Sequence, residues 1–127
     1  MFIIDFYETV NGYSDIKEFL EEIRRKATNN KDARIQYGQI TRYIELLQQN
    51  GTNLPTEVVK HIEGRIWELR PGVNRVFFFY HDGERYVLLH HYRKKTDKTP
   101  KREIERAREE MKDYIIRKGE KDELGWI

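Results

Sequence analysis

A chain of 127 residues, 38% hydrophobic and 36% charged, fits one small domain, because a domain of this size buries roughly two thirds of the surface that its unfolded chain exposes. It has no cysteine, which excludes disulfides and thiolate metal sites and favours a reducing, cytoplasmic compartment. With a formal net charge of +2, no readable signal peptide and no run of about 20 apolar residues, we expect neither secretion nor a membrane span.

The N-terminal part of the chain predicts one strand followed by two helices. Residues 2–9 (FIIDFYET) are rich in strand-favouring side chains. Ser14 is a suitable N-cap for an amphipathic helix that runs to about Ala27. After an interruption at Asn30, a second amphipathic helix continues to Gly51. Because the link between them is short, the two helices are expected to form an antiparallel hairpin.

The middle of the chain predicts three consecutive antiparallel strands. A connector that could include one helical turn at residues 57–61 leads to strands over residues 65–70, 75–80 and 86–95, which are separated by glycine-containing turns. The second and third of these strands are apolar on both faces. We therefore expect them in the centre of the sheet.

The last predicted element is a helix with Thr99 as its N-cap and Pro100 at its first position, fraying near Gly119. The predicted order is therefore β-α-α-β-β-β-α, an α+β fold in which helices back a curved antiparallel sheet in a single domain over residues 1–127. The tail, residues 119–127, is expected to be flexible or to dock on the domain or on a partner, because residues 124–127 (LGWI) are apolar for a free terminus.

Positive charge is concentrated in residues 65–102, where ten lysines and arginines accompany four acidic residues. This segment carries a formal charge of +6, and the remainder of the chain carries −4. The predicted strands bring these cations together, because Arg70 closes one strand, Arg75 opens the next and residues 93–95 end the third. Cations from three strands could surround one concavity, which would attract phosphate groups by Coulomb steering and counterion release.

Strand alternation would place Arg93 and Lys95 on one face of the sheet and Lys94 on the other. The alternative to a phosphate site is a solvated rim of the sheet. In that case the arginines of the first two strands pair with Glu68 or with an acidic residue of the second hairpin.

Binding of RNA at this site would become cleavage if a ribose 2′-hydroxyl attacked the phosphodiester in line while lysine and arginine stabilised the growing charge. Removing one such donor typically costs roughly 10²- to 10³-fold in rate. His90 or His91 could act as acid or base near neutral pH, but adjacent residues of a strand point to opposite faces and cannot share one metal. The alternative for His90 is a buried structural histidine. Tyr92 and Tyr80 could stack on bases.

Several of these segments occur together in one order: Glu68-Leu69-Arg70, Arg75-Val76-Phe77, Tyr92-Arg93-Lys94-Lys95-Thr96 and Lys98-Thr99-Pro100. In this combination the chain resembles the RelE/HigB superfamily of type II toxins, specifically its phage-derived HigB-like branch. The resemblance covers roughly residues 62–114. The first strand and the helical hairpin agree only in layout, and Tyr92 and Asp97 replace the commoner Phe and Gln.

The resemblance implies a RelE-like fold and a ribosome-dependent mRNA endonuclease that needs no metal or other cofactor. It implies the ribosome and mRNA as partners, together with a cognate antitoxin of the helix-turn-helix class. The catalytic candidates are Arg70, Arg75, Lys94, Lys95 and His90, and the RNA-binding candidates are Arg93, Tyr92, His91, Lys98, Lys101 and Arg102. Because the superfamily also includes gyrase poisons of the ParE kind, a non-catalytic binding toxin or an RNA-binding module is the alternative.

Overall fold

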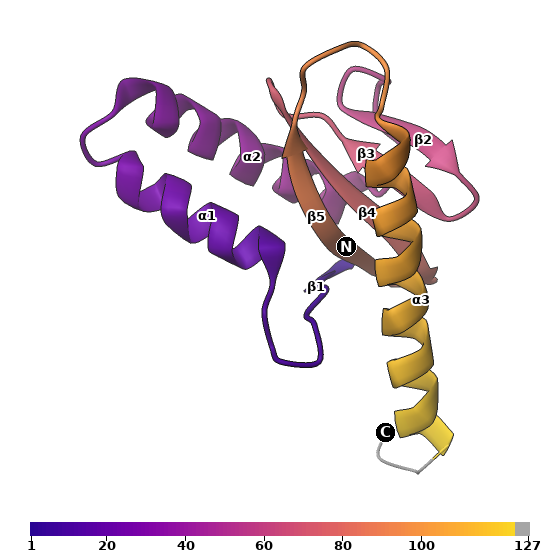
Figure 1. Cartoon of the computed structure of the whole chain (residues 1–127). Helices are drawn as coiled ribbons and strands as arrows, with labels where there is room; N and C mark the ends of the chain where they lie inside the picture. Colours follow the sequence, from indigo (N-terminus) through magenta and orange to yellow (C-terminus); the bar gives the residue numbers. More distant parts are fainter. Residues whose placement is uncertain (124–127) are drawn as a thin grey trace.

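A five-stranded sheet with helices on both faces makes up the structure, a computed structural model that describes residues 1–123 (Figure 1). The elements in chain order are β1 (Ile3–Phe6), α1 (Asp15–Lys26), α2 (Lys31–Asn50), β2 (Val59–Glu63), β3 (Ile66–Leu69), β4 (Asn74–Asp82), β5 (Arg85–Arg93) and α3 (Lys101–Glu123). The predicted α+β class is confirmed. The apolar residues 124–127 of the predicted tail lie outside the described residues.

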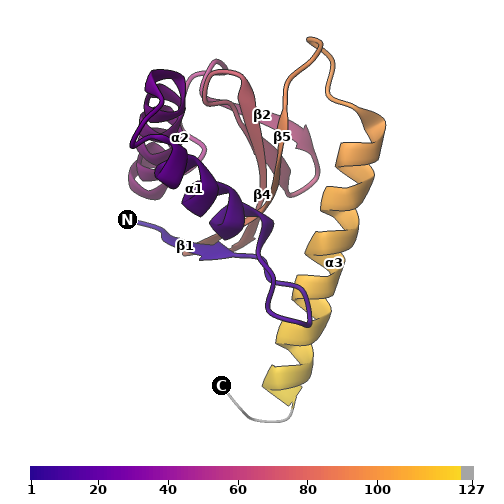
Figure 2. The ribbon, with the colours of Figure 1, turned by 60° about the vertical axis from the view of Figure 1, so that its left-hand side comes forward.

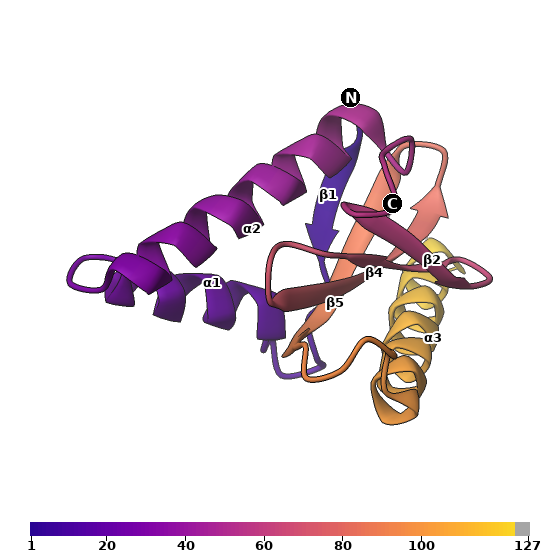
Figure 3. The same cartoon turned by 90° about the horizontal axis from the view of Figure 1, so that it is seen from above.

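The strands are arranged in the order β1-β5-β4-β3-β2. β4 and β5 occupy the interior of the sheet, as their apolar faces predict, and β2 through β5 pair antiparallel. β1 is an exception to the predicted antiparallel sheet, because it pairs parallel with β5, from Ile3 opposite Arg85 to Phe6 opposite Leu88. The α1–α2 hairpin lies on one side of the sheet and α3 on the other (Figures 2 and 3).

Alternation along the central strands divides the core between the two faces of the sheet. Phe78 packs in the cluster under α1 and α2, whereas Phe77 and Phe79 pack under α3 around Ala107. All three phenylalanines are fully buried, as predicted. The two faces are therefore covered by different helices, and a residue's position in the alternation decides which helix it meets.

The helix boundaries follow local capping signals. The Ser14 hydroxyl accepts a hydrogen bond from the Lys17 amide at 3.2 Å, and the Asn30 side chain caps α2 in the same way. α3 begins one residue after Pro100 and continues through Gly119 to Glu123, past the position at which it is predicted to fray. Within residues 1–123, no helix has the length and apolar character needed to cross a membrane.

The strand β2 was not predicted, and the helical turn expected at residues 57–61 is wrong. β2 is an edge strand that forms a hairpin with β3, with Val59 opposite Leu69 and Lys60 opposite Glu68. Of its residues only Val59 is buried. One buried side chain in five residues leaves little periodicity in the sequence, and pairing with β3 supplies the hydrogen bonds that stabilise the extended backbone.

Candidate nucleic-acid interface

A β-bulge in β5 decides where the two adjacent histidines point. Val76 pairs with His91 and Phe78 with Leu88, so Leu89 and His90 lie together opposite the single residue Phe77. Both bulge residues face α3, and the next residue, His91, faces α1. The prediction that His90 and His91 point to opposite faces is confirmed.

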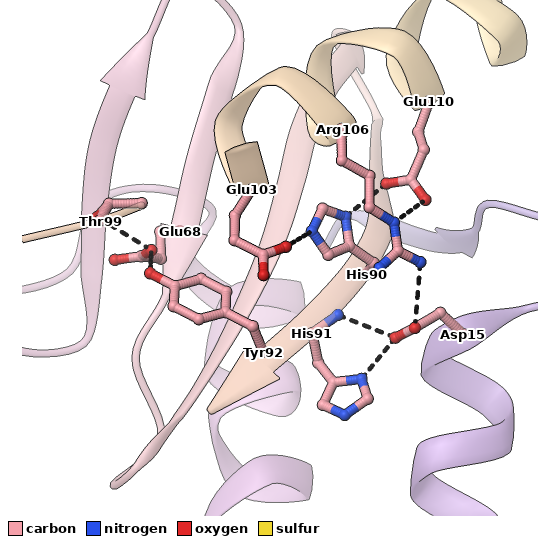
Figure 4. A network of polar contacts seen from close by, with 9 residues as sticks. All are labelled: Asp15, Glu68, His90, His91, Tyr92, Thr99, Glu103, Arg106 and Glu110. Atoms are coloured by element: carbon pink, nitrogen blue, oxygen red, sulfur yellow. Dashed lines mark hydrogen bonds and ion pairs between the residues drawn. The ribbon is translucent and has the colours of Figure 1, made fainter. Parts of the chain in front are cut away.

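His90 lies in the core between the sheet and α3 and has no exposed surface. Its Nδ1 is 2.5 Å from Glu110 Oε1, and its Nε2 is 3.1 Å from Glu103 Oε1 (Figure 4). Because an ionised carboxylate can only accept, this pair of contacts needs a proton on each ring nitrogen or on one carboxyl group. Among the described residues no three histidine or acidic side chains are placed to bind a metal ion. The environment of His90 is that of a structural histidine.

His91 belongs to a second polar cluster, at the half of β5 that extends beyond its pairing with β1. Asp15 at the start of α1 accepts from the His91 amide at 2.9 Å and from its Nδ1 at 2.5 Å (Figure 4). Arg106 of α3 reaches the same carboxylate at 3.3 Å, and the His91 ring stacks on Phe19 at 3.7 Å between centroids. The Asp15 carboxylate thereby accepts a hydrogen bond from a backbone amide at the open edge of the sheet. It also links α1, β5 and α3.

The predicted catalytic arginines converge on one buried acid, Glu68, whose side chain is 1% exposed. Glu68 Oε1 lies 3.7 Å from Arg70 Nε and 3.9 Å from Arg75 Nε. Its Oε2 accepts from the Tyr92 hydroxyl at 2.6 Å and from Thr99 Oγ1 at 3.4 Å (Figure 4). Burial, and then the hydrogen bond to Glu68, raise the pKa of Tyr92. Pairing of both arginines with Glu68, the alternative drawn from the sequence, is therefore observed, and one carboxylate serves two guanidinium groups.

The two arginines differ in their access to solvent. The Arg75 side chain is 7% exposed, and its Nη1 donates to the carbonyl oxygens of Gly72 and Asn74 at 2.7 and 2.9 Å. Burial, and then the nearby charge of Arg70, lower the pKa of Arg75. Arg70 is 21% exposed, and its Nε has no hydrogen-bond partner among the described residues. Arg75 is thus held inside the fold, whereas Arg70 lies at its surface.

The segment between β5 and α3 supplies the exposed cations. β5, the third of the consecutive predicted strands, ends at Arg93, two residues earlier than predicted. The predicted alternation of faces therefore does not apply to Lys94 and Lys95. A cavity of about 230 Å³ opens here and is lined by Tyr92, Arg93, Lys95, Thr96, Lys98, Pro100, Arg102 and Glu103. Lys94 instead pairs with the exposed Asp97 at 3.2 Å. Lys101 is exposed at the start of α3.

The cavity and the Glu68 cluster adjoin, because Tyr92 lines the cavity with its ring and contacts Glu68 with its hydroxyl. The structure thus brings together most of the predicted RNA-binding residues and sets His90 and His91 apart from them. Tyr80 lies at the opposite end of β4, where Arg65 binds its carbonyl oxygen. Lys60, which the sequence analysis missed, lies directly opposite Glu68 in the ladder and is exposed; only the register of the unpredicted strand β2 reveals it.

A larger cavity of about 430 Å³ lies between α1, α2 and the end of the sheet. Its charged lining consists of two acids, Glu22 and Asp32, and two bases, Lys26 and Arg93. The imidazole of His91 also lines it. Because the formal charges of the four charged side chains cancel, the lining supplies no net positive charge that would attract phosphate. The smaller, cationic cavity is the stronger candidate.

Residues 29–112 match the family described as phage-derived Gp49-like proteins (DUF891). The matched region contains α2, all strands from β2 to β5 and the first half of α3. It therefore includes Glu68, the arginines around it and the whole cationic cavity. No curated protein matches the chain.

Proposed function

Since the chain belongs to the phage-derived Gp49-like family, we propose that it is the toxin of a type II toxin–antitoxin system and cuts mRNA on the ribosome, as its resemblance to RelE/HigB toxins implies. The observation that carries the proposal is the cationic cavity next to the Glu68 cluster. A helix-turn-helix antitoxin would be its cognate partner.

The cations of the cavity are free to meet an anionic ligand. Among the described side chains, no ion pair involves Arg93, Lys95, Lys98 or Arg102. Glu103 is the single acidic residue of the lining, and it already contacts His90. Uncompensated cations around a concavity focus the electrostatic potential and favour a phosphate there.

In the proposed reaction the 2′-hydroxyl of one nucleotide attacks the adjacent phosphorus in line. The bond from phosphorus to the 5′-oxygen breaks, which leaves a 2′,3′-cyclic phosphate and a 5′-hydroxyl end. Lys95 and Lys98 bind the non-bridging oxygens, and Arg70 adds positive charge from the Glu68 cluster. Lys94 can release Asp97 at little cost, because both side chains are exposed, and its ammonium group then donates a proton to the departing 5′-oxygen, while the proton of the attacking 2′-hydroxyl passes to a solvent water. His90 is omitted from this set because it has no exposed surface.

The test is to map the 5′ ends of ribosome-bound messages after brief expression of the chain alone. The wild type should generate new ends, and Lys94→Ala with Lys95→Ala should reduce their rate of appearance by about 10²-fold or more. Lys31→Ala with Lys112→Ala is the matched control, because it removes two exposed lysines on α2 and α3 away from the cavity. Arg75→Ala is a poor test because its side chain is buried and holds two backbone carbonyls.

Three outcomes would separate the proposal from its alternatives. Growth arrest with inhibited DNA supercoiling and no new message ends would identify a gyrase poison. Salt-sensitive RNA binding without cleavage, in the presence or absence of ribosomes, would identify an RNA-binding module. New ends that appear equally fast with the Lys94/Lys95 variant would contradict the proposed site.

A further inference from the structure

We infer that Glu68 is the positioning residue of this site: a buried carboxylate that holds Arg70, Arg75 and the β5–α3 segment in a fixed relation to one another. The inference deepens the proposed function and rests on it for its catalytic consequence. Its structural part is supported by the contacts alone: one side chain sets the geometry of the cationic segment, which is residues 94–100 between β5 and α3.

The first argument is the cost of placing Glu68 where it is. The residue occupies a short strand between buried Ile66 and Leu69 and is itself 1% exposed. An ionised carboxylate at such a depth is unfavourable unless hydrogen bonds and opposite charge compensate for its lost hydration. An apolar residue would pack in this strand without that requirement. Packing alone therefore does not explain why an acidic residue occupies this position.

The second argument is the distribution of its partners. Tyr92 lies on β5, Arg75 on β4, Arg70 just after β3, and Thr99 on the segment that leads into α3. No two of these partners share an element, so a single side chain joins three strands to the cationic segment. Two guanidinium groups at one carboxylate also leave one positive charge uncompensated, and Arg70 presents that charge at the surface.

The third argument is that the cationic segment has few other attachments. At its start the Lys94 amide donates to the carbonyl oxygen of Val73 at 2.8 Å. Thr96 Oγ1 bonds only within the segment, to the carbonyl oxygen of Lys98. Among the described residues, the contact of Thr99 with Glu68 is the one hydrogen bond that ties residues 95–99 to the sheet. Between the two flanking elements, Glu68 is therefore the attachment point through which we expect the sheet to position Lys95 and Lys98.

The experiment compares Glu68→Gln, which keeps the shape and removes the charge, with Thr99→Val, which removes only the attachment of the segment. Amide hydrogen exchange of Lys94, whose N–H donates to the Val73 carbonyl oxygen at the start of the segment, should become about tenfold faster in Glu68→Gln and change in the same direction in Thr99→Val. In cleavage of ribosome-bound message, the maximal rate should fall by about tenfold or more, while the half-saturating ribosome concentration stays within about twofold. Glu45→Gln, an exposed acid on α2, is the control for both measurements.

The two measurements distinguish the possible failures. Unchanged exchange in Glu68→Gln and Thr99→Val would overturn the inference, whatever the nuclease does. A rise in the half-saturating concentration with an unchanged maximal rate would also overturn it, because Glu68 would then affect binding and not the geometry of the reaction. Absence of cleavage by the wild type would refute the proposed function, and the exchange measurement would still decide the role of Glu68. If Glu68→Gln fails to fold, Thr99→Val decides, because Thr99 lies outside any helix or strand.

Discussion

The side chain of Asp15 joins three elements of the fold, α1, β5 and α3. It belongs to α1, bonds the backbone and ring of His91 on β5, and pairs with Arg106 on α3. Burial alone would raise the pKa of Asp15, but the hydrogen bonds from His91 and the charge of Arg106 outweigh it, and the pKa is lowered from its ordinary value. The ionised form is therefore the one that the fold stabilises.

We predict that Asp15→Asn lowers the free energy of unfolding by about 1–3 kcal/mol at neutral pH, because hydrogen bonds to a charged, mostly buried group are lost. Since the folded-state pKa is below the unfolded value of about 3.8, the stabilisation is complete above that value and is lost as the pH falls through the folded pKa. Urea unfolding of wild type and variant at about pH 7 and about pH 3 measures this difference.

The difference in the free energy of unfolding between wild type and Asp15→Asn should therefore be smaller at the acidic pH than at neutral pH. Asp97→Asn is the control, because Asp97 is exposed and its one ion pair among the described residues is with Lys94; it should change the free energy of unfolding little at either pH. A gap that stays constant between the two pH values would show that the charge of Asp15 does not contribute and that only its shape does.

At this scale the sequence predicts local contacts and not distant ones. Ser14 was predictable as a helix N-cap because a cap bonds a backbone amide three residues away, and Asn30, predicted only as an interruption of the helical pattern, caps α2 in the same way. Glu68 could be named only as one of several acids that might neutralise the arginines. Its actual partner Tyr92 lies 24 residues away, and the register that joins them also depends on the bulge at His90, which alternation alone does not reveal.

At the scale of elements, strong apolar periodicity made the helices and the central strands predictable. α1 and α2 end within a residue or two of their predicted limits. β2 was missed because an edge strand needs only one buried side chain and obtains its stability from a neighbour. The parallel pairing of β1 was also not predictable, because it depends on how the α1–α2 hairpin carries the chain across the sheet. The candidate site itself is built on β3, β4 and β5, which were predicted.

Gly51 tests how tightly the end of α2 is joined to the sheet. It has a φ of 60°, and an added Cβ would lie 2.9 Å from Phe2 Cε2 and 2.9 Å from the Tyr86 hydroxyl oxygen. Gly64, in the β2–β3 turn, also has a positive φ, of 51°, but an added Cβ would meet nothing within 4 Å. Both glycines have a positive φ, but Gly51 differs from Gly64 in its packing, and its ψ of −142° lies outside the left-handed helical region.

We predict that Gly64→Ala costs about 1–2 kcal/mol, the penalty of a left-handed backbone for a residue with a Cβ. Gly51→Ala should cost about 1–3 kcal/mol more, because overpacking forces Phe2 and Tyr86 to shift and because its φ and ψ of 60° and −142° lie close to a region that is essentially restricted to glycine. Chemical denaturation of the two variants and the wild type gives both values. Equal losses would mean that the two aromatic side chains move aside freely and that the end of α2 is loosely packed.

At the scale of the whole molecule, charge and core are separated in space. The two faces of the sheet are buried by the α1–α2 hairpin and by α3 (Figure 2), whereas the four cations that line the cationic cavity lie at the end of the sheet where β5 leads into α3. The net charge of +2 hides this separation. The composition of residues 65–102 alone predicted the concentration of positive charge, but the cavity could be located only from the folded chain.

The separation of charge predicts how binding to RNA depends on salt. Each lysine that contacts a phosphate releases counterions, so the logarithm of the affinity for a single-stranded RNA should fall linearly with the logarithm of salt concentration. Lys95→Ala with Lys98→Ala should make that slope shallower by about 1.4, since each lost contact on a single strand contributes about 0.7. Fluorescence anisotropy of a labelled RNA at several salt concentrations measures it. Lys31→Ala with Lys112→Ala removes the same charge from the molecule and should leave the slope nearly unchanged; an equal change in both variants would mean that net charge, and not the cavity, attracts the RNA.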